Sequence, residues 1–326
     1  MAEKRAWNIK VTTDVRVVNN SDGSTKINEY ICKSNVLGSG SYGNVTLVER
    51  LSENNSTRSF AMKQLSKLKL KSLKTYKKVP SSDDPDSYTM VAHTQLNRVM
   101  EEIEIMRHLY HKNIVILFEV LENDKNIWFI LEHMEKGPVL VFDPSTKGFQ
   151  SPLVETSVVH EELAKSHLRD IVNGTMYLHS LNIAHRDIKP SNILLNDEGR
   201  CHLSDFGCAK RLVRNDEMCI DTIGTYHFVA PECCSDSSFD PLKVDIWAIG
   251  VTLYCMLLGK LPFDGETTVE LFENIQGGRL DFPVSAGLSD EVRDLLQAIL
   301  VKDPANRVSL QGILEHPWLS EDAPSF

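Results

Sequence analysis

The pattern of apolar and polar residues changes along the chain. Two short apolar runs, at residues 45–48 and 60–63, flank a polar stretch at residues 52–57 that is rich in Ser and Asn. This arrangement predicts two strands joined by a turn. The longest apolar stretch, residues 246–258, is too short to span a bilayer and predicts a buried helix instead.

A different spacing predicts an amphipathic helix near residue 100. Val99, Ile103 and Met106 recur at three- and four-residue steps, and Leu109 and Tyr110 continue the series. Such steps place the apolar side chains on one face of a helix.

Composition and charge narrow the class of protein. The chain has 326 residues, of which 42% are hydrophobic and 25% are charged, as is typical of a globular protein with a core. Its net charge of −10 argues against nucleic acid or an anionic membrane as partners, because both need a clustered basic surface. No secretory signal, lipidation motif or paired cysteine spacing is visible, and the seven cysteines indicate reduced thiols. We therefore expect a cytoplasmic protein, with the nucleus as the alternative.

The most informative stretch reads HRDIKPSN at residues 185–192. It places an acid, a cation and an amide at a spacing that serves phosphoryl transfer from ATP to a hydroxyl. Asp187 would accept or orient the hydroxyl proton, Lys189 would contact the transferring phosphate, and Asn192 would hold Mg2+, with Mn2+ as an alternative. The stretch resembles the catalytic loop of protein kinases, in its serine/threonine form.

A glycine-rich run, GSGSYGNV, lies upstream at residues 38–45. A dinucleotide-binding fold uses similar glycines, but there the run opens a helix, whereas here it continues into the predicted strand pair. The run therefore resembles the kinase loop that covers the ATP phosphates. The resemblance places Gly38, Gly40 and Gly43 in that loop and has Lys63 grip the α and β phosphates.

The predicted helix supplies a partner for this lysine. By resemblance, Glu102 corresponds to the glutamate that holds Lys63 in its phosphate-binding pose. Glu101 and Glu104 are the neighbouring alternatives. We favour Glu102, because Met106 then falls one turn later, where kinases stack a core residue.

Further kinase motifs follow in order. LSDFG at residues 203–207 supplies Asp205 as a second Mg2+ ligand. By resemblance, Thr225 bonds both Asp187 and Lys189, so its loss should disable transfer.

Two downstream motifs are expected to be structural. Glu232, in the APE motif that closes the activation segment, is expected to pair with Arg307. DIWAIG at residues 245–250 resembles the buried helix that anchors the kinase catalytic loop.

The resemblance implies the bilobal α+β protein-kinase fold, with a small β-rich N-lobe that carries helix C and a larger, mainly helical C-lobe around an ATP cleft. We expect an N-terminal extension at residues 1–28, a kinase domain at 29–320 and a tail at 321–326. Within the kinase domain, the N-lobe is expected at about 29–131, with a basic and polar insert at about 66–92, and the C-lobe at about 135–320.

The same resemblance implies where adenine binds. Residues near the lobe boundary would meet the ring, with Leu131 as the gatekeeper. The expected ATP contacts outside the glycines, Lys63 and Glu102 are Leu37, Val45, Ala61, Leu131, Glu132, Met134 and Leu194. Core packing is the alternative role for the aliphatic members, and both roles are compatible.

Four shorter strings resemble one kinase family, the calcium/calmodulin-dependent protein kinase kinases, which activate AMP-activated and related kinases. They are AMKQLSK at residues 61–67, FEVL at 118–121, KGPV at 136–139 and VTLYC at 251–255. The implied substrate is another protein kinase. A kinase of the wider calmodulin-kinase group with other substrates is the alternative. A kinase-like scaffold is the remote one, because Lys63, Asp187 and Asp205 are all present.

Substrate selection by short motif is expected to be weak. Kinases that prefer arginine upstream of the target read it with carboxylates, and two of those positions hold Ser191 and Pro138 here. The insert offers another route, because Lys67, Lys69, Lys71, Lys74, Lys77 and Lys78 make a basic run ahead of a polar and acidic stretch. A solvated loop and a docking element are both open interpretations of this insert.

Regulation centres on Arg186, which precedes the catalytic aspartate. In such kinases an anion on the activation segment neutralises this arginine and orders the segment. Thr222 is the candidate phosphoacceptor, and the acids Asp216, Glu217 and Asp221 are the alternative partners. We expect basal activity without phosphorylation.

Calmodulin is not expected to bind the end of this chain. Residues 320–326 are too short and too acidic to form the basic amphipathic helix that calmodulin recognises. The sequence leaves open whether calmodulin control is absent or the chain is trimmed.

Overall fold

The computed structural model describes residues 9–21, 23–40, 43–51, 56–80, 88–154, 158–214, 217–221, 223–235 and 237–320. The chain divides into two compact units. Unit 1 comprises Met1–Tyr110 and Val115–His133, and unit 2 comprises His111–Ile114 and Met134–Phe326. The candidate Thr222 and its neighbour Asp216 lie outside the described residues.

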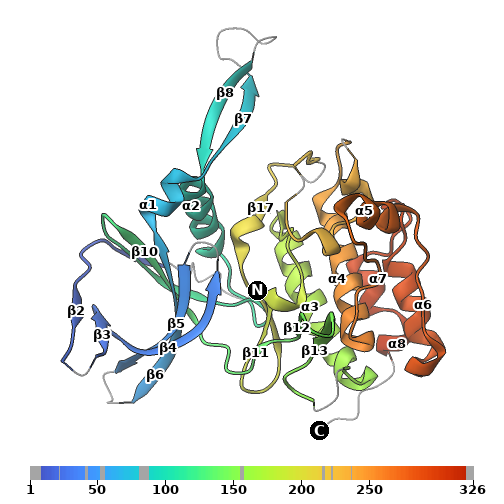
Figure 1. Cartoon of the computed structure of the whole chain (residues 1–326), viewed down its shortest axis with the longest axis horizontal. Helices are drawn as coiled ribbons and strands as arrows, with labels where there is room; N and C mark the ends of the chain where they lie inside the picture. Colours follow the sequence, from blue (N-terminus) through green and yellow to red (C-terminus); the bar gives the residue numbers. More distant parts are fainter. Residues whose placement is uncertain are drawn as a thin grey trace, which may run out of the picture. The chain divides into compact units, whose positions relative to one another are not determined.

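Unit 1 is built on an eight-stranded sheet (Figure 1). Its strands are β1 (Lys10–Thr12), β2 (Val17–Asn19), β3 (Thr25–Ile27), β4 (Tyr30–Gly40), β5 (Gly43–Leu51), β6 (Thr57–Ser66), β9 (Leu117–Glu122) and β10 (Asn126–Glu132). The order is β1-β9-β10-β6-β5-β4-β3-β2, with β1 and β9 parallel. β5 and β6 are the strand pair that the sequence predicts, so that prediction is confirmed.

The sheet of unit 1 curls, because β1 and β2 form its opposite edges and only residues 13–16 join them. Such a linker spans at most roughly 18 Å. Buried Glu119 on β9 ties the N-terminal strands to the sheet, since it accepts hydrogen bonds from Thr12 Oγ1 at 2.6 Å and Tyr30 Oη at 2.9 Å. The expected N-terminal extension therefore contributes three strands to this sheet.

The basic insert is folded where the structure describes it. It forms helix α1 (Lys67–Ser72) and an antiparallel hairpin of β7 (Lys74–Pro80) and β8 (Tyr88–Thr94), rather than an irregular loop. The hairpin extends away from α1 and α2 in Figure 1. Its strand character was missed because short strands depend on cross-strand pairing rather than on their own periodicity.

Helix α2 (Gln95–Met106) follows the hairpin and confirms the predicted amphipathic helix. Thr94 and Asn97 form a capping box that fixes its start. The helix ends before Leu109 and Tyr110. Leu109 is buried, but Tyr110 is 61% exposed, so its expected place on the apolar face is wrong.

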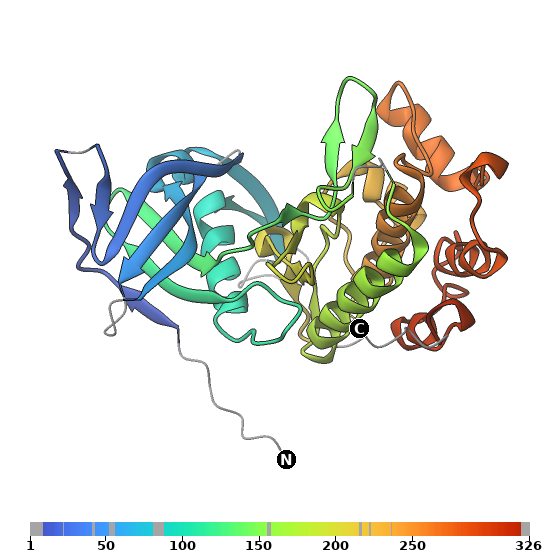
Figure 2. The ribbon, with the colours of Figure 1, turned by 90° about the horizontal axis from the view of Figure 1, so that it is seen from below.

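Unit 2 is mainly helical, and its helices are α3 (Glu161–Ser180), α4 (Pro241–Leu258), α5 (Thr268–Gly277), α6 (Asp290–Ile299), α7 (Leu310–Leu314) and α8 (Pro317–Ser320). Its short strands are β11 (Gly137–Pro138), β12 (Val141–Asp143), β13 (Gly148–Gln150), β14 (Ile183–Ala184), β15 (Ile193–Leu195), β16 (Cys201–Leu203) and β17 (Lys210–Arg211). The β12–β13 hairpin projects from unit 2 in Figure 2, where it is drawn in green.

Helix α4 is the core of unit 2 and packs against α3, α6 and β14. It is the one described helix long and apolar enough to cross a membrane, but 83% of it is buried within the protein, as in a core helix. The helix begins at Pro241 after an Asp240 cap and ends at Gly259, whose φ of 64° favours glycine. The predicted buried helix at residues 246–258 is thus confirmed.

Candidate active site

The catalytic loop of unit 2 lies between β14 and β15 and is anchored by Asp245 on α4. This fully buried carboxylate accepts the backbone N–H groups of His185 at 2.9 Å and Arg186 at 2.8 Å. It also lies 2.9 Å from His179 Nε2. Burial alone would raise the pKa of Asp245, but the hydrogen bond with His179 and nearby positive charge lower it. Asp245 is therefore an ionised anchor rather than a reacting group.

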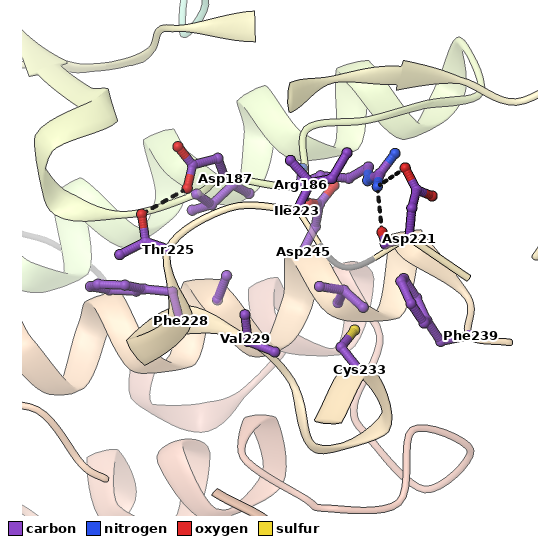
Figure 3. A pocket seen from close by; sticks show the side chains of 13 residues that line it. Arg186, Asp187, Asp221, Ile223, Thr225, Phe228, Val229, Cys233, Phe239 and Asp245 are labelled. Atoms are coloured by element: carbon purple, nitrogen blue, oxygen red, sulfur yellow. Dashed lines mark hydrogen bonds and ion pairs between the residues drawn. The ribbon is translucent and has the colours of Figure 1, made fainter. Parts of the chain in front are cut away.

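Asp187 is the focus of the loop, and three side chains converge on its carboxylate. Oδ2 lies 2.8 Å from both Lys189 Nζ and Asn192 Nδ2. Oδ1 accepts a hydrogen bond from Thr225 Oγ1 at 3.1 Å (Figure 3). Lys189 Nζ also donates to Thr225 Oγ1 at 2.7 Å, so the predicted bonds of Thr225 are both present. The network holds Asp187 as an oriented acceptor beside a cation.

The two predicted metal ligands are Asn192, which belongs to this network, and Asp205, which follows it in the sequence. Asn192 is buried, and its amide nitrogen is committed to Asp187, which leaves the amide oxygen to bind a cation. Ser204, next to Asp205, is bound to the Asn192 carbonyl through both its N–H and its Oγ at 2.9 Å. Carboxylate and amide oxygens are ligands that suit Mg2+. The donor set therefore fits the metal that the motifs predict.

Asp205 and Phe206 have distinct local geometry. Asp205 adopts a left-handed φ of 57°, a conformation that costs energy for a non-glycine residue. Phe206 is buried and its ring lies 5.1 Å from that of His185, which fixes the segment to the catalytic loop. Packing thus compensates for the backbone strain.

Unit 1 carries the predicted phosphate-binding lysine. Lys63 Nζ on β6 donates to Glu102 Oε1 on α2 at 3.2 Å. Glu102 is buried, whereas Glu101 and Glu104 are exposed, and Glu104 pairs with Arg107. The structure therefore selects Glu102 among the three glutamates.

The glycine run forms the β4–β5 turn of unit 1. Gly40 pairs with Gly43 across the turn, and the two residues between them lie outside the described residues. A Cβ at Gly43 would lie 1.6 Å from the Gln64 carbonyl oxygen, so only glycine fits against β6. Val45 on β5 is paired with Lys63 on β6. The run is thus held directly beside the lysine strand.

The predicted adenine contacts divide between the two units. In unit 1, Ala61 on β6 is the cross-strand partner of Leu131 on β10, and Leu37 is 47% exposed on β4. Glu132 N–H donates to Ile116 O at 2.9 Å. In unit 2, Met134 is buried and Leu194 pairs with Pro138 in a short sheet. The roles of these residues in binding ATP stay predictions.

The activation segment is tied to the catalytic loop through Arg186. Its Nη2 lies 3.0 Å from Asp221 Oδ2 and donates to the Asp221 carbonyl at 2.7 Å (Figure 3). A second ion pair joins Lys210 to Glu217 at 2.8 Å. Of the two expected acids that the structure describes, Glu217 and Asp221, it is Asp221 that binds Arg186.

Two further contacts in unit 2 stabilise the fold around the site and take no part in the reaction. Arg307 makes a bidentate pair with Glu232, at 2.7 and 2.9 Å, as predicted. The contact between His179 and Asp245 was not anticipated. An aspartate directly before the long apolar run is the signal that could have identified Asp245 itself as the anchor.

The fold and the site define a protein kinase. The family model described as "Protein kinase domain" matches residues 31–319, and the chain belongs to this family. It is a protein serine/threonine kinase with the bilobal α+β kinase fold.

Relatives that are similar to this chain are also kinases. The serine/threonine-protein kinase GRIK1 of Arabidopsis thaliana is 34% identical over 318 residues, 97% of this chain and 73% of that protein. A calcium/calmodulin-dependent protein kinase kinase of Caenorhabditis elegans is 33% identical over 309 residues, 93% of this chain. The serine/threonine-protein kinase TOS3 of Saccharomyces cerevisiae is 33% identical over 308 residues, 87% of this chain. The chain spans 54% and 52% of the length of the latter two.

Proposed function

We propose that this kinase acts upstream of other kinases, transferring the γ-phosphoryl group of ATP to Ser or Thr hydroxyls in their activation loops. AMP-activated and calmodulin-dependent types are the proposed targets. The similarity to a calcium/calmodulin-dependent protein kinase kinase over 93% of the chain carries this proposal. The general alternative is a kinase of the wider calmodulin-kinase group that acts on other substrates.

The chemistry proposed for each side chain follows from its contacts. Asp187, oriented by Thr225 and Asn192, would accept a hydrogen bond from the substrate hydroxyl and take its proton. Lys189 would compensate the negative charge that gathers on the phosphoryl oxygens. Lys63, held by Glu102, would position the α and β phosphates. Asn192 and Asp205 would hold Mg2+, which neutralises phosphate charge when bound.

Two positions support recognition of the substrate through a docking surface rather than through basic residues near the phosphorylated Ser or Thr. Exposed Ser191 and partly buried Pro138 present no carboxylate. A substrate arginine there would lack the charge-assisted hydrogen bonds that contribute about 1.5–3 kcal/mol each. The Lys-rich segment at the start of the insert is the proposed docking element.

We also propose that Asp221 does the work of a phosphate in the activation segment. Its carboxylate and carbonyl both bind Arg186, the arginine that such a phosphate would neutralise. Activity without phosphorylation of Thr222 is the expected consequence.

Radiolabel transfer from Mg-ATP tests the proposed substrate. The acceptors are an AMP-activated kinase catalytic domain made inactive by mutation and a generic basic protein, each with and without Ca2+/calmodulin. Label on the activation-loop threonine of the kinase domain, absent with Asp187→Ala, is the expected result. Label on the basic protein alone would keep the kinase and overturn the upstream role. A difference in labelling with and without Ca2+/calmodulin would show that calmodulin controls this enzyme.

A further inference from the structure

A basic surface lies at the start of the insert in unit 1. Lys69, Lys71 and Lys74, on α1 and at the start of β7, are exposed and make no ion pair with a described residue. Exposed Leu68, at 80%, lies on the same helix. On its inner side α1 is fixed by fully buried Leu70. We refer to Lys69, Lys71, Lys74 and Leu68 as the basic segment.

An acidic surface lies on α5 in unit 2. Glu266, Glu270 and Glu273 follow each other at four- and three-residue steps, so they line one side of the helix and the turn before it. All three are exposed, and none makes an ion pair with a described lysine or arginine. Val269 beside them is 68% exposed. We refer to these four residues as the acidic face.

The acidic face borders the end of the activation segment. Tyr226, in the turn after Thr225, stacks edge-to-face on Phe272 of α5 with ring centroids 5.8 Å apart. Leu271 and Ile275 are buried and hold α5 against the rest of unit 2. A molecule bound on the acidic face would therefore lie beside the segment that carries Thr225.

We propose that the basic segment of one copy of this kinase docks on the acidic face of a second copy. The two surfaces match in charge, three lysines against three glutamates, and each adds an exposed aliphatic side chain. Opposite charges steer association and set which surfaces meet, while the aliphatic residues add apolar burial. The contact is heterologous, because the two surfaces lie on different units of the chain. It rests on the docking role proposed above for the Lys-rich segment and adds a second copy of this kinase to the partners of that segment.

Docking of this kind has a consequence for activity. A copy held at the acidic face raises the local concentration of one kinase at the activation segment of the other. Phosphorylation of one copy by another should then rise with enzyme concentration and fall with salt, because salt screens exposed charges.

A charge swap tests the contact in the whole chain by sedimentation velocity, without nucleotide or substrate. One variant carries Lys69→Glu, Lys71→Glu and Lys74→Glu, and the other carries Glu266→Lys, Glu270→Lys and Glu273→Lys. We expect the unaltered chain to self-associate at low salt. For each variant alone, the dissociation constant of self-association should rise by about tenfold or more. An equimolar mixture of the two variants should regain association, because each basic surface again meets an acidic one. The matched control, Lys26→Glu with Lys112→Glu and Lys147→Glu, alters exposed lysines elsewhere and should associate like the unaltered chain.

Three results would each overturn the proposal: a monomeric unaltered chain at high concentration and low salt, no recovery in the mixture, or equal weakening by the control. Recovery also shows that both variants fold, since an unfolded variant has no surface to offer. Because no phosphoryl transfer is measured, failure here is distinct from failure of the proposed substrate, which the labelling of a kinase domain reports.

Discussion

The catalytic loop and the activation segment differ in how many contacts fix them. Asp187 is held by three side chains, and the backbone of the same loop is bound by the buried carboxylate of Asp245. Asp221, in contrast, is 46% exposed, and its ion pair among the described residues is with Arg186. The first region is determined by the interior of unit 2, whereas the second depends on surface charge. The structure thus separates the catalytic groups, which several buried contacts hold in place, from the more exposed segment that is open to regulation.

The largest effect is expected from Asp187→Asn. The change keeps the size of the side chain but removes the base and the negative charge beside Lys189. Loss of a positioned base lowers the turnover rate about 10²- to 10⁴-fold. Initial rates at saturating Mg-ATP would measure this, with the melting temperature as the check on folding. Turnover within a factor of a few of the unaltered enzyme would remove Asp187 from the mechanism.

Asp245→Asn should destabilise the catalytic loop as a whole. An amide cannot accept all the hydrogen bonds that the carboxylate receives from His185, Arg186 and His179, so buried donors lose their partner. We expect a loss of about 3 kcal/mol in the free energy of unfolding. Calorimetric melting would record it together with a loss of activity. Asp240→Asn is the control on the same helix, because asparagine caps a helix as well as aspartate does. Equal melting of the two variants would contradict the anchoring role.

The sequence predicted the catalytic loop far better than its surroundings. Asp187, Lys189 and Asn192 lie within one short loop, so their spacing in the sequence nearly determines their spacing in space. The pairs Lys63–Glu102 and Glu232–Arg307 are distant in sequence and came from resemblance to a family rather than from any local pattern.

The surroundings of the site depend on pairings that no local pattern encodes. β1 joins the sheet only because β9 offers a parallel partner more than a hundred residues away. The first strand of the β7–β8 hairpin reads KTYKKVP, which lacks the alternation of a strand with one buried face. Glu217 and Asp221 are the described candidate acids for Arg186, and only the path of the chain in space selects Asp221 between them.

Thr225→Val tests the link between the two regions, since Thr225 belongs to the activation segment but bonds Asp187 and Lys189. Valine keeps the shape and loses both hydrogen bonds, which should lower turnover roughly 10- to 100-fold. Because the role is positioning, kcat should fall while KM for ATP changes little. Thr225→Ser restores the hydroxyl and should recover most of the activity. If serine and valine behaved alike, the hydroxyl would not be what matters.

The smallest effect is expected from Asp221→Asn, which tests whether the activation segment is held more weakly than the catalytic loop. The carbonyl of residue 221 still binds Arg186, and the lost ion pair is partly exposed, so the expected cost is below about 1 kcal/mol, or less than about fivefold in activity. The decrease should shrink at high salt, because salt already screens the pair in the unaltered enzyme.

Thr222→Ala should leave activity unchanged if the carboxylate of Asp221 supplies the charge that Arg186 needs. Measuring the activity of both variants after phosphatase treatment separates the effect of the Asp221 carboxylate from that of a phosphate on Thr222. A large loss with Thr222→Ala and none with Asp221→Asn would assign the control of this segment to phosphorylation instead.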